Sequence, residues 1–212
     1  QCACAVMDLP FEPEYGKPAG NLLARSGANL ALTQMLGADV RKHADGSWDC
    51  LFEKTEELAQ EYEAQSKRVY RIPIGGSSAL GACGYVAAAE EIKRQMNIDF
   101  DFVVTPSSSR STHAGLAHVF RNDLVEVVGI SCDPEPDLGE HVQQLVQELH
   151  VLLGGDYDPS KKIRLEYGWY EPGYGVPSER SIEAIKLLAK TEGLFLDPIY
   201  SGKAFSGLLD LA

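Results

Sequence analysis

No stretch of the 212-residue sequence approaches the roughly 18 consecutive apolar residues that a membrane-spanning helix needs. The first residues also lack the charged and apolar pattern of a signal peptide. Hydrophobic residues make up 44% of the chain and charged residues 24%, which is typical of a globular domain. We therefore expect a cytoplasmic protein with no membrane partner.

The sequence has no basic stripe and no Cys-x-x-Cys pair. Its formal net charge of −12 argues against nucleic acid as a partner, because binding to a phosphate backbone needs clustered lysine and arginine. Its five cysteines and five histidines are scattered rather than placed at metal-ligand spacing. We therefore expect no metal site, and cysteines that stay reduced.

What the sequence does contain is an alternation of short apolar runs with longer amphipathic segments. In one such segment Leu51, Leu58 and Tyr62 recur at helical spacing. The pattern predicts strands at residues 2–7, 39–43, 69–74, 102–105, 125–131 and 163–167, and helices at residues 27–36, 48–65, 80–96, 112–120, 138–153, 181–192 and 202–211. This alternation favours an α/β fold of three layers (αβα), with a mainly parallel sheet between helices.

A break in the middle of the chain divides this pattern into two parts. The consecutive small residues at positions 75–78 end one set of elements before the next predicted helix begins. We therefore place a domain boundary here, with one domain at residues 1–74 and a second at residues 75–212.

Residues 102–115 carry the most informative pattern, Phe-Val-Val-Thr-Pro-Ser-Ser-Ser-Arg-Ser-Thr-His-Ala-Gly. A predicted strand ends in a cluster of hydroxyl residues, and a predicted helix follows. The first N–H groups of a helix have no intrahelical acceptor and, together with the helix dipole, favour an anion. Two interpretations stay open: a cup for a phosphate, or a serine-rich turn with a good N-cap. The hydroxyls belong to Ser107, Ser108, Ser109, Ser111 and Thr112.

Three further segments are distinctive: residues 71–86 (Arg-Ile-Pro-Ile-Gly-Gly-Ser-Ser-Ala-Leu-Gly-Ala-Cys-Gly-Tyr-Val), 173–177 (Gly-Tyr-Gly-Val-Pro) and 196–204 (Leu-Asp-Pro-Ile-Tyr-Ser-Gly-Lys-Ala). With the loop at 102–115 they resemble, in the same order, D-cysteine desulfhydrases and 1-aminocyclopropane-1-carboxylate deaminases. These are pyridoxal-phosphate enzymes of the tryptophan-synthase-β type (fold type II). The resemblance implies a partial small domain at 1–74 and a partial large, cofactor-binding domain at 75–212.

The resemblance also assigns contacts to pyridoxal 5'-phosphate. It places the phosphate on residues 107–112 and puts Gly75 and Gly76 near the cofactor. Arg110 stands where the family usually has glycine. This arginine would either narrow the loop or add a positive charge beside the phosphate.

The implied catalytic side chains lie in the two later segments. By resemblance, Tyr174 contacts a small amino-acid substrate and assists proton transfer, Tyr200 lies against the pyridine ring, and Ser201 faces the ring nitrogen. The deaminases carry an acidic residue at the position of Ser201, so its neutral hydroxyl favours β-elimination from D-cysteine or a related amino acid. From the residues alone, Tyr174 could equally pin its loop to the core. For residues 197–200 the residues alone favour a strand-to-helix turn with a buried Tyr200.

The family holds its cofactor through a Schiff-base lysine followed by a Ser-Asn-His motif, and these 212 residues contain neither. We therefore expect no covalent attachment of the cofactor to this chain. Three functions stay open: part of a pyridoxal-phosphate-dependent lyase, a non-catalytic truncated remnant that binds a phosphorylated ligand or a partner subunit, or an unrelated phosphate-ligand α/β module. A partial fold would leave sheet edges unpaired, so we also expect a homo-oligomer.

Overall fold

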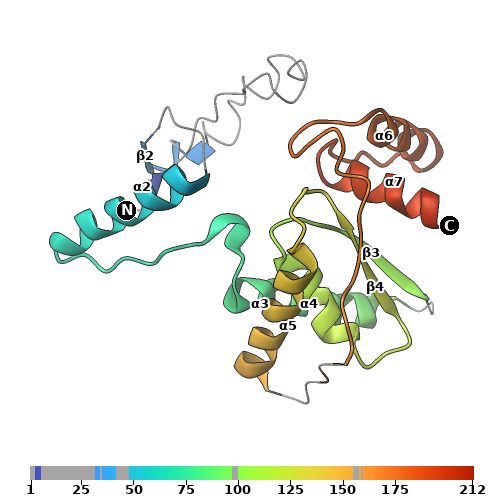
Figure 1. The fold of residues 1–212 in the computed structure, drawn as a ribbon, viewed down its shortest axis with the longest axis horizontal. Coiled ribbons are helices and arrows are strands. Elements are labelled where there is room, and N and C mark those ends of the chain that lie inside the picture. Colours follow the sequence, from blue (N-terminus) through green and yellow to red (C-terminus); the bar gives the residue numbers. More distant parts are fainter. Residues whose placement is uncertain are drawn as a thin grey trace. The chain divides into compact units, whose positions relative to one another are not determined.

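The computed structural model describes residues 3–5, 32–33, 35–41, 48–96, 100–154, 158 and 160–212. The chain divides into two compact units, residues 1–71 and 72–212, which are described separately (Figure 1). The assignment of residues 1–74 to a small domain and of 75–212 to a large one stays a prediction. The helix predicted at residues 27–36 lies mostly outside the described residues.

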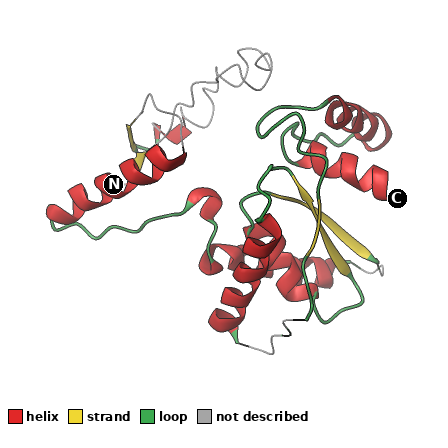
Figure 2. Ribbon diagram, viewed as in Figure 1, coloured by secondary structure: helices red, strands yellow, loops and turns green. Residues whose placement is uncertain are grey.

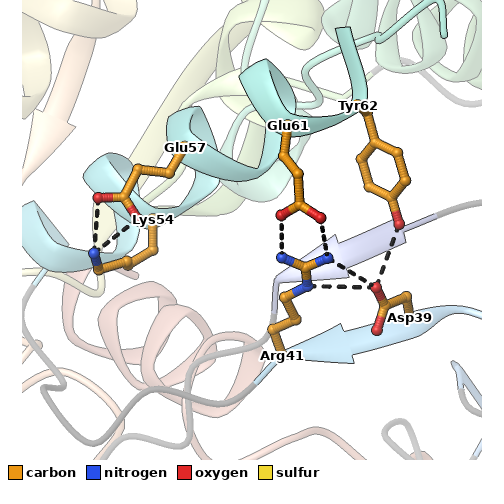
Figure 3. Close-up of polar contacts among 6 residues, drawn as sticks. All are labelled: Asp39, Arg41, Lys54, Glu57, Glu61 and Tyr62. Carbon is orange, nitrogen blue, oxygen red and sulfur yellow. Dashed lines mark hydrogen bonds and ion pairs between the residues drawn. The ribbon is translucent and has the colours of Figure 1, made fainter. Parts of the chain in front are cut away.

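The first unit contains a pair of parallel strands and one long helix. Strand β1 (Ala3–Ala5) pairs with β2 (Asp39–Arg41), and helix α2 spans Trp48–Ala64. The Arg41 guanidinium donates to both carboxylate oxygens of Glu61 on α2, at 2.6 and 3.1 Å, and also contacts Asp39 (Figure 3). These contacts tie the helix to the second strand.

The prediction of a strand at residues 69–74 is wrong. Residues 67–73 have no regular secondary structure, and a short 3₁₀ turn, η3 (Ile74–Gly76), follows them. Tyr70 and Ile72 are 69% and 72% exposed, so the face of this segment that carries them is not buried against a sheet. The Arg71 side chain instead forms ion pairs with two carboxylates of α2, and proline contributes no N–H to a ladder. The apolar alternation therefore had no partner strand among the described residues.

The second unit is built on three parallel strands, in the order β3, β4, β5. Helices cover both faces of this sheet (Figures 1 and 2). The strands are β3 (Phe102–Ser107), β4 (Glu126–Ser131) and β5 (Arg164–Glu166), and the helices are α3 (Ala79–Gln95), α4 (Ser111–Phe120), α5 (Leu138–Leu153), α6 (Glu179–Glu192) and α7 (Ser201–Leu211). The predicted parallel α/β sheet is confirmed.

The alternating side chains of β4 separate two cores. Val127 packs with Leu116 and Phe120 of α4, on the side that α3 and α5 also cover. Val128 and Ile130 point the other way and pack with Ala204 of α7. Both faces of the sheet are therefore buried, which gives the three layers expected from the sequence. Within the described residues, no helix has both the length and the apolar character that would let it cross a membrane.

Candidate functional site

The serine-rich loop lies at the carboxyl end of β3. The strand continues to Ser107, two residues further than the sequence indicates, and α4 begins at Ser111. Only residues 108–110 therefore form the loop itself. The first N–H groups of α4 face this edge, where the helix end favours a negative charge.

Two hydroxyls at this edge have side-chain partners. The Ser107 hydroxyl lies 3.2 Å from Nδ1 of His113, which is fully buried beneath the loop. The Ser108 hydroxyl donates to the carboxylate of Asp133, at 3.2 Å. Asp133 follows β4, so this bond joins the carboxyl ends of two neighbouring strands.

The 3₁₀ turn packs against the serine-rich loop. The Ser111 hydroxyl lies 3.5 Å from the carbonyl oxygen of Gly76, and Gly75 has a φ of +64°. A Cβ atom on Gly75 would lie 2.4 Å from both Cβ and Oγ of Ser109. Glycine is therefore required at position 75 by close approach as well as by backbone conformation.

Arg110 adopts the backbone conformation that glycine favours. Its φ is +81° and its ψ is −37°, directly before α4. Its Nε atom is buried and has no hydrogen-bond partner among the described residues. Arg110 therefore holds a backbone angle that costs free energy for a residue other than glycine, and its expected effect on the loop or on a phosphate stays a prediction.

Replacing Arg110 by glycine is expected to raise the free energy of unfolding by about 1 kcal/mol. A positive φ costs a non-glycine residue about 1–2 kcal/mol, and the greater freedom of glycine in the unfolded chain offsets part of that gain. Urea unfolding followed by circular dichroism measures the change. Arg94→Gly, in the last turn of α3, is the matched control and should lose about 1 kcal/mol. A lower unfolding midpoint for Arg110→Gly would contradict the prediction.

The turn before α7 is organised by one carboxylate. Asp197 accepts hydrogen bonds from the backbone N–H groups of Ile199, Tyr200 and Ser201, at 2.7–2.9 Å. The Ser201 hydroxyl also donates to this carboxylate. Although burial raises the pKa of Asp197, these hydrogen bonds hold it below its ordinary value. The contact between Ser201 and a pyridine nitrogen stays a prediction.

The two tyrosines implied by resemblance meet at this turn. The hydroxyls of Tyr174 and Tyr200 lie 2.5 Å apart, and their rings are in edge-to-face contact. Cys132 connects the turn that carries Tyr200 to the end of β3, because its N–H donates to the Ser107 carbonyl and its thiol to the Tyr200 carbonyl. The predicted site residues of both segments therefore gather at the carboxyl edge of β3 and β4.

Burial raises the pKa values of two weakly acidic groups at this edge, the half-exposed Tyr200 and the buried Cys132. It raises the pKa of Tyr200 above its ordinary value, and the hydrogen bond with Tyr174 raises it further. It also raises the pKa of the Cys132 thiol to about 12. Both groups are therefore protonated at neutral pH. Tyr200 can donate or relay a proton here, but it is not deprotonated at neutral pH and so cannot act directly as a general base.

Lys203 is a further residue at this edge, and the sequence does not single it out. It lies in the first turn of α7, is 0% exposed, and donates from Nζ to the carbonyls of Tyr170 and Gly173, at 2.7 and 2.8 Å. Burial lowers its pKa. The sequence feature that could have indicated a buried lysine is its position between two small residues, Gly202 and Ala204, on the side of α7 that faces the sheet.

A family model described as pyridoxal-phosphate dependent enzyme matches residues 15–212. The chain belongs to this family. Its place among pyridoxal-phosphate-dependent enzymes agrees with a loop of hydroxyls at a helix start, followed by an aromatic turn at the same sheet edge.

The chain is similar in sequence to D-cysteine desulfhydrases. It is 47% identical over 159 residues to those of Yersinia pestis (strain Pestoides F) and Yersinia pseudotuberculosis (serotype O:1b, strain IP 31758). The alignment covers 73% of this chain and 48% of each relative. The chain therefore spans about half the length of the curated relatives that it matches.

Two solved structures have a similar fold. An ACC deaminase homologue superposes with a TM-score of 0.79 at 31% identity, covering 86% of this chain and 56% of that one. A hydrogen sulfide-producing enzyme from Fusobacterium nucleatum gives a TM-score of 0.53 at 18% identity, covering 84% and 59%. The second likeness shows the fold alone.

The residues at this edge fit the phosphate of the family's cofactor. The first turn of α4 supplies N–H groups, of which that of Ser111 already donates to the Ser109 carbonyl. Within the described part of the chain, the hydroxyls of Ser109 and Thr112 make no hydrogen bond. Asp133 places one negative charge beside Ser108, and Arg110 supplies a positive charge on the same loop. The donor set is therefore suited to a phosphate monoester.

Proposed function

We propose that this chain supplies the phosphate-binding and ring-facing part of a pyridoxal-phosphate-dependent enzyme that acts on D-cysteine or a related small amino acid. The reaction would be β-elimination, with release of sulfide, pyruvate and ammonia. The observation that carries the proposal is the link through Cys132 between the end of β3, which leads into the serine-rich loop, and the turn that carries Tyr200, whose hydroxyl contacts that of Tyr174. Similarity to proteins named D-cysteine desulfhydrase supports the choice of substrate.

The residues of this chain divide the work between binding and proton transfer. When bound, the cofactor would act as the electron sink for the substrate's Cα. The serine-rich loop would hold its phosphate through N–H groups and hydroxyls. Tyr200 would present its ring and its protonated hydroxyl, and Tyr174 would share that proton with it across 2.5 Å. The neutral Ser201 hydroxyl is the feature that favours elimination over cyclopropane opening.

The test is an assay of sulfide release from D-cysteine, with pyridoxal phosphate added. The protein assayed is the full-length polypeptide that contains these residues. We expect release from D-cysteine but not from L-cysteine. Tyr174→Phe should lower kcat about 100-fold, because a positioned acid–base group contributes roughly 10²–10⁴. Tyr70→Phe, an exposed position in the first unit, is the control and should leave kcat unchanged. Faster ammonia release from 1-aminocyclopropane-1-carboxylate than sulfide release from D-cysteine would assign the deaminase reaction instead.

A second candidate is a non-catalytic protein that binds a phosphorylated ligand or a partner subunit. It is favoured by the state of Lys203, the lysine beside Tyr200, whose ammonium is buried and bonded to two carbonyls. Such an amine is not available for a covalent bond to the cofactor. Binding of pyridoxal phosphate without sulfide release, and without a lysine adduct after borohydride treatment, would favour this candidate. Self-association and a cytoplasmic location stay predictions from the sequence.

A further inference from the structure

Lys203 combines complete burial with uncharged partners. Fully buried lysines are rare, because the ammonium must recover in the protein the hydrogen bonds that it loses in water. Here it recovers two of them from the carbonyls of Tyr170 and Gly173. Both carbonyls belong to the irregular segment between β5 and α6, which also carries Tyr174 directly after the second carbonyl.

This segment has little regular support of its own. It contains a backbone hydrogen bond from the N–H of Val176 to the carbonyl of Gly173, and Gly168 and Gly175 take positive φ angles. Among the described residues, its hydrogen bonds to α7 are those from Lys203 and one from the indole of Trp169 to Asp210, and Trp169 also packs against the cluster that contains Ala204. The Lys203 attachment is the one adjacent in sequence to Tyr174.

The same turn of α7 holds both sides of the tyrosine contact. Tyr200 directly precedes the helix, and its carbonyl accepts from the N–H of Ala204, the residue after Lys203. The lysine therefore bonds the Tyr174 segment from a position one turn away from Tyr200. A displacement of this segment by about 1 Å would break the 2.5 Å contact between the two hydroxyls.

We propose that Lys203 is a positioning residue, whose buried ammonium holds the Tyr174 hydroxyl against the Tyr200 hydroxyl. Its relevance to catalysis rests on the proposed function, but the contact itself needs no cofactor. A methionine of similar length would fill the space and leave both carbonyls without donors. The segment would then move toward water, and the hydroxyl pair would separate.

The test is ¹⁹F NMR of the protein labelled with 3-fluorotyrosine, without cofactor. The resonances of Tyr174 and Tyr200 are identified by their loss in the Tyr174→Phe and Tyr200→Phe variants. In Tyr174→Phe the Tyr200 resonance should shift, because its partner hydroxyl is gone. Lys203→Met should shift it in the same direction by at least half as much, and the double variant should add little to Tyr174→Phe.

Two controls separate positioning from loss of stability. Lys186→Met removes an exposed charge from α6 and should leave both resonances unchanged. Leu149→Ala destabilises the opposite side of the sheet, and should lower the unfolding midpoint without moving the Tyr200 resonance. If Lys203→Met does not fold, Lys203→Gln keeps one hydrogen-bond donor and should give a partial shift.

Unchanged tyrosine resonances in a folded Lys203→Met variant would overturn the proposal. So would an absence of any Tyr200 shift in Tyr174→Phe. If neither the methionine nor the glutamine variant folds, the lysine serves the fold rather than the pair, and the proposal is also rejected. A protein that shows the coupled shifts but releases no sulfide would retain this inference and lose the proposed function.

Discussion

Replacing Gly129 by alanine is expected to destabilise the second unit by about 3 kcal/mol. Gly129 lies in the middle strand of the described sheet, and an added Cβ would lie 2.4 Å from both Cε1 and Nδ1 of His113. It would also lie 3.0 Å from a methyl carbon of Leu165. The imidazole is fully buried and bonded to Ser107, so it cannot move aside without disturbing the serine-rich loop.

The matched control is the same substitution where space is available. Gly84 lies within α3, and an added Cβ there would meet no atom within 4 Å. Gly84→Ala should therefore stabilise the protein by about 0.5–1 kcal/mol, because alanine favours the helix. Urea unfolding of both variants gives the comparison. Equal unfolding midpoints for Gly129→Ala and the parent protein would show that the sheet and His113 can separate at little cost.

Acidification from pH 7.5 to 5 is expected to remove about 2 kcal/mol of stability for each of two buried histidines. Burial lowers the pKa of His113 to about 4, and burial together with Arg121 and His150 lowers that of His118 to about 4. In the unfolded chain both side chains would take up a proton near pH 6.5. The unfolded state therefore binds more protons than the folded state between pH 6.5 and 4, and stability falls as the pH falls through this window.

Stability falls rather than rises on acidification because the pKa values of these two histidines are lower in the folded state than in the unfolded state. Above pH 6.5 both states hold neutral histidines, so this loss is absent. The reference pKa values of aspartate and glutamate lie below this range, so carboxylates contribute less to the change in stability between pH 7.5 and 5. The measurement is a series of urea unfolding curves at several pH values, analysed for the change in free energy.

His118→Phe provides the control for this pH dependence. The phenylalanine ring can keep the edge-to-face contact that His118 makes with His150. The substitution removes the buried Nδ1 of His118, which has no hydrogen-bond partner among the described residues. The variant should match the parent protein in stability at pH 7.5 and lose about half of the acid sensitivity. A parent protein whose free energy of unfolding is flat from pH 7.5 to 5 would refute the assignment of buried neutral histidines.

The sequence predicted the regular elements of the second unit well, because their periodicities were strong. Leu145 and Leu149 of α5, for example, lie at helical spacing and both enter the core. The sequence predicts an end of β3 at residue 105, two residues too early, because proline supplies no N–H to a ladder. Pro106 is tolerated since β3 is the end strand of the sheet that the described residues form. As a result Ser107 is a strand residue rather than a loop residue.

The roles of the candidate site residues stay predictions from the sequence, and the hydrogen bonds that connect these residues could not be predicted from it. The serine cluster and the tyrosine motif were visible in the sequence, whereas the link through Cys132 depends on residues 68 positions apart. The positive φ of Arg110 was also not readable, because arginine rarely adopts that conformation. Lys203 was missed because a lysine in a helix is ordinarily a solvent-exposed residue.

The distance in sequence between Cys132 and Tyr200 has a consequence for the order of folding. Strands β3, β4 and β5 pair with their neighbours in the chain, so each pairing closes only a short loop. The docking of α7 on β3 and β4 closes a much longer one, and such contacts form slowly. We expect the amides of β4 to gain protection in pulse-labelling hydrogen exchange before those of α7. The Tyr174–Tyr200 contact would then be the last part of the candidate site to form, after the serine-rich loop at the end of β3 is already in place.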